Sequence, residues 1–231
     1  LYNYKFMEHK YDVIIVGAGA AGMMSAIEAG KRGRKVLLID HAKKIGEKIR
    51  ISGGGRCNFT NIHTHPSKFI SKNQKFVISA LKQYTQNDFI NLINKHNIKF
   101  HEKKLGQLFC DQSAQQIVDM LILECQTAKV TLKKETCITE VDKQDDKYFI
   151  DTGDDKYSCT SLIIATGGLS VPKIGASKFG YDIAQKFNMN IVETLPALVP
   201  LTFNEKILEM CNELSGLSLE AAVFFKKIFF Q

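Results

Sequence analysis

The stretch from Tyr11 to Asp40 constrains the fold of this chain more than any other part of the sequence. Val13–Val16 is a continuous apolar run, which predicts a parallel strand buried on both faces. It runs directly into Gly17-Ala18-Gly19-Ala20-Ala21-Gly22, a complete G-x-G-x-x-G, and then into a small, apolar helical face. A second apolar run, Val36–Ile39, ends at an acid. Strand, glycine turn, helix, strand and acid in this order predict an α/β fold of the Rossmann type.

Each glycine of this turn has a physical role. Gly17 permits the tight strand-to-helix turn, Gly19 lets a pyrophosphate approach the backbone, and Gly22 lets the helix pack close to the strand. The helix start at Ala20 and Ala21 offers free N–H groups and a partial positive charge to phosphates. Asp40, 18 residues after Gly22, is placed to accept hydrogen bonds from a ribose. We therefore expect a bound dinucleotide, with a ligand-free glycine turn as the alternative.

Composition narrows the class of protein. A length of 231 residues allows one large domain or one and a half, and 45% hydrophobic residues are enough for a core. No apolar run approaches the roughly 20 residues that span a bilayer, and the first ten residues do not look like a signal peptide. The six cysteines are scattered without a C-x-x-C pair, which argues against a metal site, a disulfide framework and a dithiol centre. We expect a cytoplasmic protein with no membrane partner.

The net charge of +7 raises the question of nucleic acid. The lysines are spread along the chain rather than gathered into a stripe with interleaved aromatic residues. A positive field also suits a ligand that carries a pyrophosphate. From charge alone, a nucleic-acid partner is not expected.

A second glycine-rich segment, ISGGGRCNFTN, follows the first unit. Consecutive glycines form either a flexible surface linker or a loop pressed against a ligand. The surrounding hydrogen-bonding and cationic groups favour contact with a ligand. The candidate binding residues here are Lys48, Ser52, Gly53, Gly54, Gly55, Arg56, Cys57 and Asn58.

With Gly46-Glu47-Lys48 and the first glycine turn, SGGGRCN resembles the flavoprotein family that includes aminoacetone-oxidase-like and bile-acid-reductase-like enzymes. The resemblance implies a Rossmann-like FAD-binding domain, with a parallel sheet, flanking helices and a β-meander. It implies FAD as cofactor, NAD(P)H as a candidate transient co-substrate, and hydride transfer between the flavin and a small organic substrate. Arg56, Cys57 and Asn58 are candidates to lie near the flavin ring, and no catalytic acid or base is assigned.

The middle of the chain alternates between the two kinds of secondary structure. Phe76–Tyr84 has helical spacing, Thr85-x-x-Asp88 is a capping box for the next helix, and Ser113-x-x-Gln116 opens another. Residues 130–157 alternate like strands, with turns at Asp145-Asp146 and Gly153-Asp154. Residues 104–110 resemble a short turn of the family, with Gln107 and Cys110 in place of its arginine and proline.

Two further contacts follow from the resemblance. In related FAD proteins a strand in the 130–157 region meets the adenine through its backbone, which by position implies Ile138. Leu162–Ile164 is another buried strand, and Ala165-Thr166-Gly167-Gly168 after it resembles the A-T-G-G turn beside the adenosine and pyrophosphate. Thr166, Gly167 and Gly168 are therefore candidate cofactor contacts.

The C-terminal part resembles the entry into the family's inserted substrate domain, at Pro196–Leu201. The expected organisation is an N-terminal extension at 1–10, an FAD-binding domain at 11–195, and the incomplete beginning of an inserted β-rich substrate domain at 196–231. The tail FFKKIFFQ matches nothing in the resemblance. A truncated, non-catalytic fragment is therefore the alternative to an active oxidoreductase, and an FAD-dependent protein acting on RNA is a weaker one. Substrate identity, NADH or NADPH preference and oligomeric state stay open.

Overall fold

A computed structural model describes residues 8–171, 174–195, 202–217, 223–225 and 228–230. The chain divides into two compact units, Leu1–Ile191 and Val192–Gln231. Within the described residues, no helix is long and apolar enough to cross a membrane.

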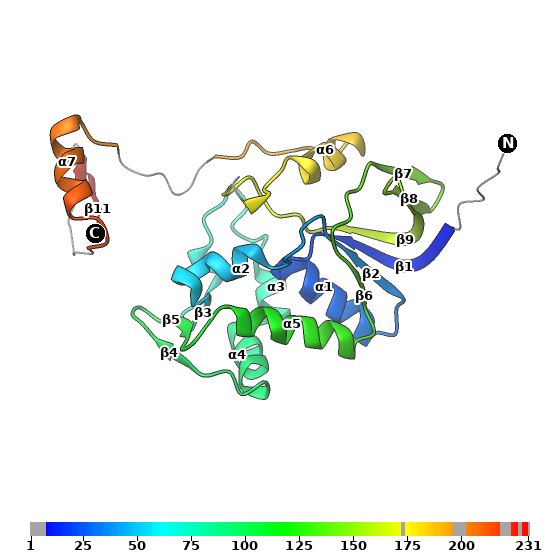
Figure 1. The fold of residues 1–231 in the computed structure, drawn as a ribbon, viewed down its shortest axis with the longest axis horizontal. Coiled ribbons are helices and arrows are strands. Elements are labelled where there is room, and N and C mark those ends of the chain that lie inside the picture. The colour runs from blue at the N-terminus through cyan, green and yellow to red at the C-terminus, as the bar shows by residue number, and fades with distance from the viewer. Residues whose placement is uncertain (1–7, 172–173, 196–201, 218–222, 226–227, 231) are drawn as a thin grey trace. The chain divides into compact units, whose positions relative to one another are not determined.

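A six-stranded mixed sheet forms the centre of the first unit, with strand order β6-β2-β1-β9-β8-β7 (Figure 1). Its parallel part consists of β6 (Thr131–Lys133), β2 (Val36–Ile39), β1 (Glu8–Val16) and β9 (Lys156–Ile164). Its antiparallel part is a meander of β7 (Glu140–Gln144), β8 (Lys147–Asp151) and β9. The predicted fold class, a Rossmann-like sheet with a β-meander, is confirmed.

Alternate residues of β1 pack into two hydrophobic cores, one on each face of the sheet. For this reason its apolar run is continuous. Val13 and Ile15 pack on one face beneath α1 (Ala20–Lys31) and α5 (Gln115–Thr127). Ile14 packs on the other face, where α6 (Phe179–Lys186) lies. Figure 1 shows α6 on the side of the sheet opposite α1 and α5.

A small antiparallel sheet, β3-β5-β4, lies beside the helices. It is made of β3 (Asn58–Asn61), β4 (Phe100–Glu102) and β5 (Gln107–Cys110). The helix α2 (Glu47–Ile51) and a 3-10 turn (Ser52–Gly55) lead into β3. Residues 107–110 are therefore a strand that follows the expected turn.

Between β3 and β4 the chain forms a 3-10 turn (Pro66–Lys68), α3 (Ile78–Gln83) and α4 (Gln86–Lys95). Thr85 and Asp88 cap α4 reciprocally, so the predicted capping box is confirmed. The prediction for α5 is less accurate, since Ala114 occupies its N-cap without a side-chain cap. Ser113 instead accepts a hydrogen bond from the N–H of Gln115, two residues on.

The second unit contains α7 (Glu205–Glu213) and a hairpin of β10 (Val223–Phe225) and β11 (Ile228–Phe230). The side chain of Asn204 caps α7 by accepting from the N–H of Ile207. The expected domain entry at Pro196–Leu201 lies outside the described residues, as do Leu1–Met7 of the expected extension. Glu8, His9 and Lys10 of that extension belong to β1 and pair with β9.

Candidate functional site

A cavity of about 610 Å³ opens in the first unit, where β1, β2 and β9 end. Its size lies within the range of roughly 300–1,000 Å³ that is usual for small-molecule sites. Twelve of the candidate residues line it: Gly17, Gly19, Ala20, Ala21, Asp40, Lys48, Ser52, Cys57, Asn58, Ile138, Thr166 and Gly167. Six others do not: Gly22, Gly53, Gly54, Gly55, Arg56 and Gly168. Segments far apart in the sequence thus converge on one cavity.

The glycine turn combines one open position with two packed ones. A Cβ on Gly17, where φ is +102°, would lie 2.6 Å from the carbonyl oxygen of Ala165. A Cβ on Gly22 would lie 1.8 Å from the carbonyl oxygen of Gly17. A Cβ on Gly19 would meet no described atom within 4 Å, because this residue faces the cavity. Gly22 therefore sets helix packing, while Gly19 keeps the entrance to the α1 N-terminus open.

Asp40 lies at the end of β2 and is almost buried. Its Oδ2 accepts from the N–H of Ala18 at 2.6 Å, and its Oδ1 accepts from the N–H of Ala42 at 2.8 Å. Its carbonyl oxygen accepts from the N–H of Thr136, at 3.0 Å. This last bond holds the residue 136–138 loop against the end of β2. Ile138 consequently reaches the cavity from a loop that precedes β7, rather than from a strand.

Lys48 links two walls of the cavity. It projects from α2, and its Nζ donates a hydrogen bond to the carbonyl oxygen of Gly168 at 3.0 Å. A Cβ on Gly167 would lie 3.3 Å from the same Nζ. The ammonium group therefore sits directly against the turn after β9, at the wall that Thr166 and Gly167 contribute.

The three consecutive glycines serve the backbone turn rather than the cavity wall. Gly53, Gly54 and Gly55 all have positive φ. A Cβ on Gly53 would lie 2.7 Å from the backbone nitrogen of Asn58 and from the ring of Phe109. Arg56 does not line the cavity, and its Nη1 donates to the carbonyl oxygen of Asp111 at 3.1 Å. The turn places Ser52, Cys57 and Asn58 in the wall of the cavity.

Cys57 lies beside Cys110, a contact that the sequence did not predict. Asn58 pairs with Phe109 between β3 and β5, and the N–H of Cys110 donates to the carbonyl oxygen of Arg56. Cys57 and Cys110 are therefore cross-strand neighbours, and both are free thiols. Burial raises the pKa of Cys57 and raises the pKa of Cys110 to about 11. Both sulfurs are thus protonated and weakly nucleophilic at neutral pH.

Several residues of the cavity wall were missed by sequence reasoning. They include His41, Thr136, Cys137, Phe59 and Phe89. His41 and Cys137 directly follow or precede predicted contacts, so proximity in sequence was a usable signal. Phe59 and Phe89 come from β3 and α4, and their ring centroids are 6.0 Å apart. Helical spacing predicts that Phe89 packs against other residues. It does not show whether the ring lies in the core or in the wall of a cavity.

Known proteins are similar to this chain at two levels of sequence identity. It is 50% identical over 214 residues to a ribosomal RNA dihydrouridine synthase of Escherichia coli K12, covering 93% of this chain and 54% of that protein. It is 25% identical over 191 residues to a 3-dehydro-bile acid delta(4,6)-reductase of Clostridium scindens, covering 81% and 46%. The chain thus spans about half the length of the curated relatives it matches.

Solved structures agree on the fold. A flavocytochrome c3 fumarate reductase superposes with a TM-score of 0.52 at 18% identity, covering 77% of this chain and 40% of that one. At this identity the likeness concerns the fold alone, which is that of a Rossmann-like FAD-binding domain.

One expectation is corrected by these relatives. Nucleic acid was not expected as a partner, yet the relative at 50% identity is named for action on ribosomal RNA. The expectation rested on the spacing of lysines along the chain, and folding brings together charges that are separated in sequence. The expectation also left out where the acidic residues lie along the chain. Between Glu47 and Asp88 the chain has no acidic residue and seven basic ones: Lys48, Arg50, Arg56, Lys68, Lys72, Lys75 and Lys82.

The resemblance to flavoproteins drawn from the sequence is confirmed at the level of the family. Residues 11–221 match the family described as HI0933-like protein Rossmann domain. This match includes the whole cavity described above. The chain therefore belongs to the HI0933-like family of Rossmann-fold proteins.

Proposed function

We propose that this chain binds FAD and reduces uridine in ribosomal RNA to dihydrouridine, with NAD(P)H as the electron source. The observation that carries the cofactor assignment is the convergence of the glycine turn, Asp40 and the Thr166-Gly167 turn on one cavity. The substrate assignment is supported by the 50% identity to a ribosomal RNA dihydrouridine synthase.

The residues of the cavity fit FAD in chemistry and shape. Gly19 leaves room for a pyrophosphate at the N-terminus of α1, where N–H groups lack side-chain caps. The ammonium group of Lys48 supplies a positive charge at the facing wall. Asp40 and the 136–138 loop offer a carboxylate and backbone groups suited to a ribose and an adenine. Met24, Phe59 and Leu121 provide apolar surface for a flat ring system.

The chain's own contribution is binding, orientation and exclusion of water. FAD bound here and reduced by NAD(P)H would supply a hydride to the C5=C6 double bond of a uracil, and a proton added to the other carbon would complete the reduction. Phe59 and Phe89 close part of the wall with apolar surface, which keeps water from that side of the cavity. Asp40 holds the glycine turn in register through Ala18, so the phosphate-binding backbone is fixed before the cofactor arrives.

A small organic substrate is the second candidate, since the relative at 25% identity is a bile-acid reductase. We prefer RNA because the identity to the bile-acid reductase is half the identity to the ribosomal RNA dihydrouridine synthase, and its alignment covers less of this chain. Work on ribosomal RNA would place the protein in the cytoplasm, where the sequence analysis expects it.

The direct test uses the purified 231-residue chain with FAD, NAD(P)H and an unmodified ribosomal RNA transcript. We expect nucleoside mass spectrometry to show a uridine that gains two hydrogen atoms only when NAD(P)H is present. An unsaturated 3-ketosteroid, incubated in parallel, reports the small-substrate alternative. Reduction of the steroid while the RNA stays unmodified would refute the RNA assignment and support the other.

A further inference from the structure

The connection between β3 and α4, residues 62–84, is called the basic arm below. It carries Lys68, Lys72, Lys75 and Lys82 and contains no Asp or Glu. All four lysines are exposed, and none of them forms an ion pair with a carboxylate of the described residues. Lysines elsewhere in the first unit do form such pairs, for example Lys95 with Glu124 and Lys31 with Glu28. The arm therefore presents positive charge that the described part of the protein leaves uncompensated.

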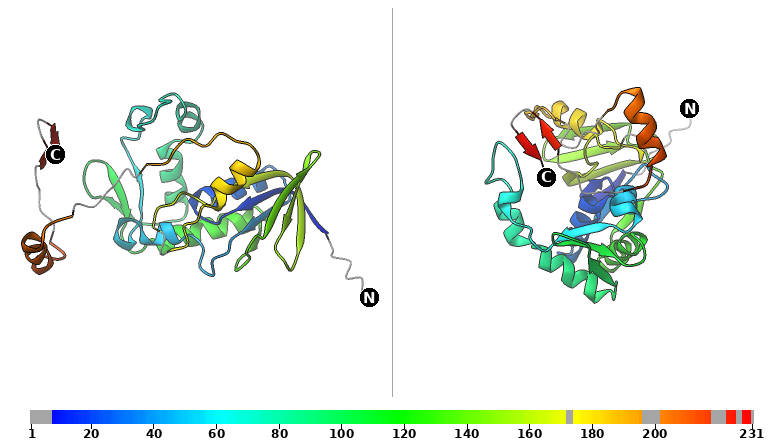
Figure 2. Two further views of the ribbon diagram at one scale, coloured as in Figure 1. Left: turned by 90° about the horizontal axis from the view of Figure 1, so that it is seen from above. Right: turned by 90° about the vertical axis from the view of Figure 1, so that its left-hand side faces the viewer.

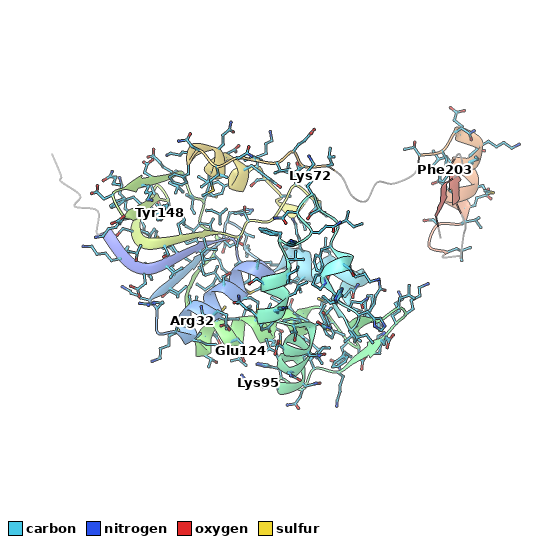
Figure 3. The ribbon with its side chains drawn as sticks, turned by 180° about the vertical axis from the view of Figure 1, so that it is seen from behind. Arg32, Lys72, Lys95, Glu124, Tyr148 and Phe203 are labelled. Carbon is cyan, nitrogen blue, oxygen red and sulfur yellow. The ribbon has the colours of Figure 1, made fainter. Side chains whose placement is uncertain are left out.

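Large apolar side chains are exposed between these lysines. Phe69 is 42% exposed, Phe76 is 79% exposed, and Ile70 is fully exposed. Neither phenylalanine contacts another described aromatic ring. Single exposed apolar residues are ordinary, but three within eight positions, interleaved with lysines, form a continuous feature. Both views of Figure 2 show the arm, coloured cyan, protruding from the first unit, and Lys72 is labelled in Figure 3.

The two ends of the arm are attached at the cavity wall. The arm follows β3, which carries Phe59, and precedes α4, which carries Phe89. Both rings line the cavity and contact each other. The N–H of Ile62 donates to the carbonyl oxygen of Gly106, and Gln86 donates to the carbonyl oxygen of Ile62. A ligand held by the arm is thereby held beside the cavity.

We propose that the basic arm is a surface that binds unpaired RNA, with its lysines on phosphates and with Phe69 and Phe76 stacked on bases. The inference rests on the proposed function and names the part of this chain that holds the substrate. Lysines without carboxylate partners suit a polyanion, whereas a second protein would leave them unneutralised unless it were acidic. Exposed rings interleaved with cations are how single-stranded nucleic acid is recognised, because every base offers a face for stacking. Duplex RNA hides those faces, so we expect a preference for unpaired strands.

The charge part of the proposal is tested with Lys68→Ala/Lys72→Ala/Lys75→Ala and a labelled single-stranded oligouridylate. The matched control removes three exposed lysines of the central sheet, one from β1 and two from the β7–β8 hairpin, as Lys10→Ala/Lys143→Ala/Lys147→Ala. Each phosphate contact contributes about 0.7 to the slope of log affinity against log salt for single strands. We expect the arm variant to flatten that slope by about 2 and the control to leave it as in the wild type. Equal slopes for both variants would overturn the proposal.

The aromatic part is tested with Phe69→Ala/Phe76→Ala, compared with Phe69→Tyr/Phe76→Tyr, which keeps two stacking rings. We expect the alanine variant to bind the oligouridylate at least about tenfold more weakly and the tyrosine variant to bind it nearly as well as the wild type. Circular dichroism and flavin absorbance verify that both variants are folded. If the alanine variant bound RNA normally but lost a dimer in sedimentation, the arm would be a self-association surface and the proposal would be wrong.

The outcome separates this inference from the proposed function. A wild-type chain that binds flavin and reduces uridine, with arm variants that bind RNA normally, refutes the arm alone. A wild-type chain that binds no oligouridylate at low salt also refutes the arm. Failure to bind flavin or to reduce uridine, with RNA binding that depends on the arm, refutes the function alone.

Discussion

Lys48 and Gly168 are joined by a hydrogen bond of 3.0 Å that connects positions 120 residues apart in the sequence. The bond joins α2 to the turn after β9, and Lys48 and Gly167 both line the cavity. In the sequence, the lysine precedes a glycine-rich segment and the turn follows a buried strand. Their contact joins the two motifs at one cavity.

Replacement of this lysine tests its role in holding a pyrophosphate. We expect Lys48→Met to weaken FAD binding about tenfold, since it removes both a cross-cavity bond and a positive charge, a loss of about 1.4 kcal/mol. Fluorescence titration with FAD at two salt concentrations measures the effect, and the salt dependence is expected to diminish. Lys43→Met, at an exposed lysine that does not line the cavity, is the matched control. Equal affinities of the two variants would contradict the assignment.

The glycine turn allows packing and ligand access to be separated. Gly22→Ala places a Cβ 1.8 Å from a backbone oxygen, so we expect a loss of about 2 kcal/mol or more in unfolding free energy. Gly19→Ala adds a methyl group in open space at an extended backbone position, and we expect stability to remain unchanged. The same methyl group would obstruct the phosphates and weaken FAD binding at least about tenfold. Urea denaturation and FAD titration of both variants provide the comparison, and normal FAD binding by Gly19→Ala would count against the site.

Cysteine labelling reports where the cofactor lies. Cys137 is exposed and lines the cavity next to Ile138. We expect a maleimide to label Cys137 rapidly and FAD to slow that labelling, as followed by peptide mass spectrometry. Cys211, on α7 in the second unit, is partly exposed and serves as an internal control that FAD leaves unaffected. Buried Cys110 is expected to react only after unfolding, and Cys57, a buried residue of the cavity wall, much more slowly than Cys137, because burial raises the pKa of each. Unchanged labelling of Cys137 would remove the 136–138 loop from the site.

A buried carboxylate outside the cavity predicts how stability depends on pH. Glu124 of α5 accepts hydrogen bonds from Lys95 and His96 at 2.7 Å each and lies near Lys31 (Figure 3 labels Glu124 and Lys95). The Lys95 hydrogen bond, followed by that of His96, lowers the pKa of Glu124 below its ordinary value of 4.5. The folded state therefore favours the charged carboxyl. Its contribution is complete above pH 4.5 and is lost as the pH falls through the lower, folded pKa.

Glu124→Gln tests this contribution. We expect the variant to lose about 1–2 kcal/mol of unfolding free energy at pH 7 and to show a weaker dependence on pH between 5 and 3. Urea denaturation across that range is the measurement. Parallel stability curves for the variant and the wild type would show that Glu124 does not contribute through its charge.

Local signals in the sequence predicted much of the fold. The continuous run at Val13–Val16, the glycine turn and the Thr85 capping box all depend on neighbouring residues, and all three were predicted correctly. Of β9, only Leu162–Ile164 was expected as a buried strand, but the strand runs continuously over Lys156–Ile164. It pairs with β1 along almost its whole length, and a contact between such distant segments leaves no local trace in sequence.

The candidate site was predicted only in part, because contacts between distant segments leave no local trace in the sequence. Cavity residues such as Gly19 and Thr166 lie in recognisable sequence motifs. The β3–β5 pairing that brings Cys57 beside Cys110 and turns Arg56 towards Asp111 joins segments some fifty residues apart. The helix α7 was not predicted at all, although Asn204 caps it, because the sequence there was interpreted only through a resemblance to a β-rich domain.

Flavin binding by the purified 231-residue chain is the most direct test of the assignment. The visible absorption spectrum would be recorded after saturation with FAD and removal of the excess, and released flavin would be identified after denaturation. We expect FAD in a ratio close to one per chain, with Gly19→Ala markedly depleted under the same conditions. A colourless wild-type chain that is folded by circular dichroism would show that the cavity does not hold FAD.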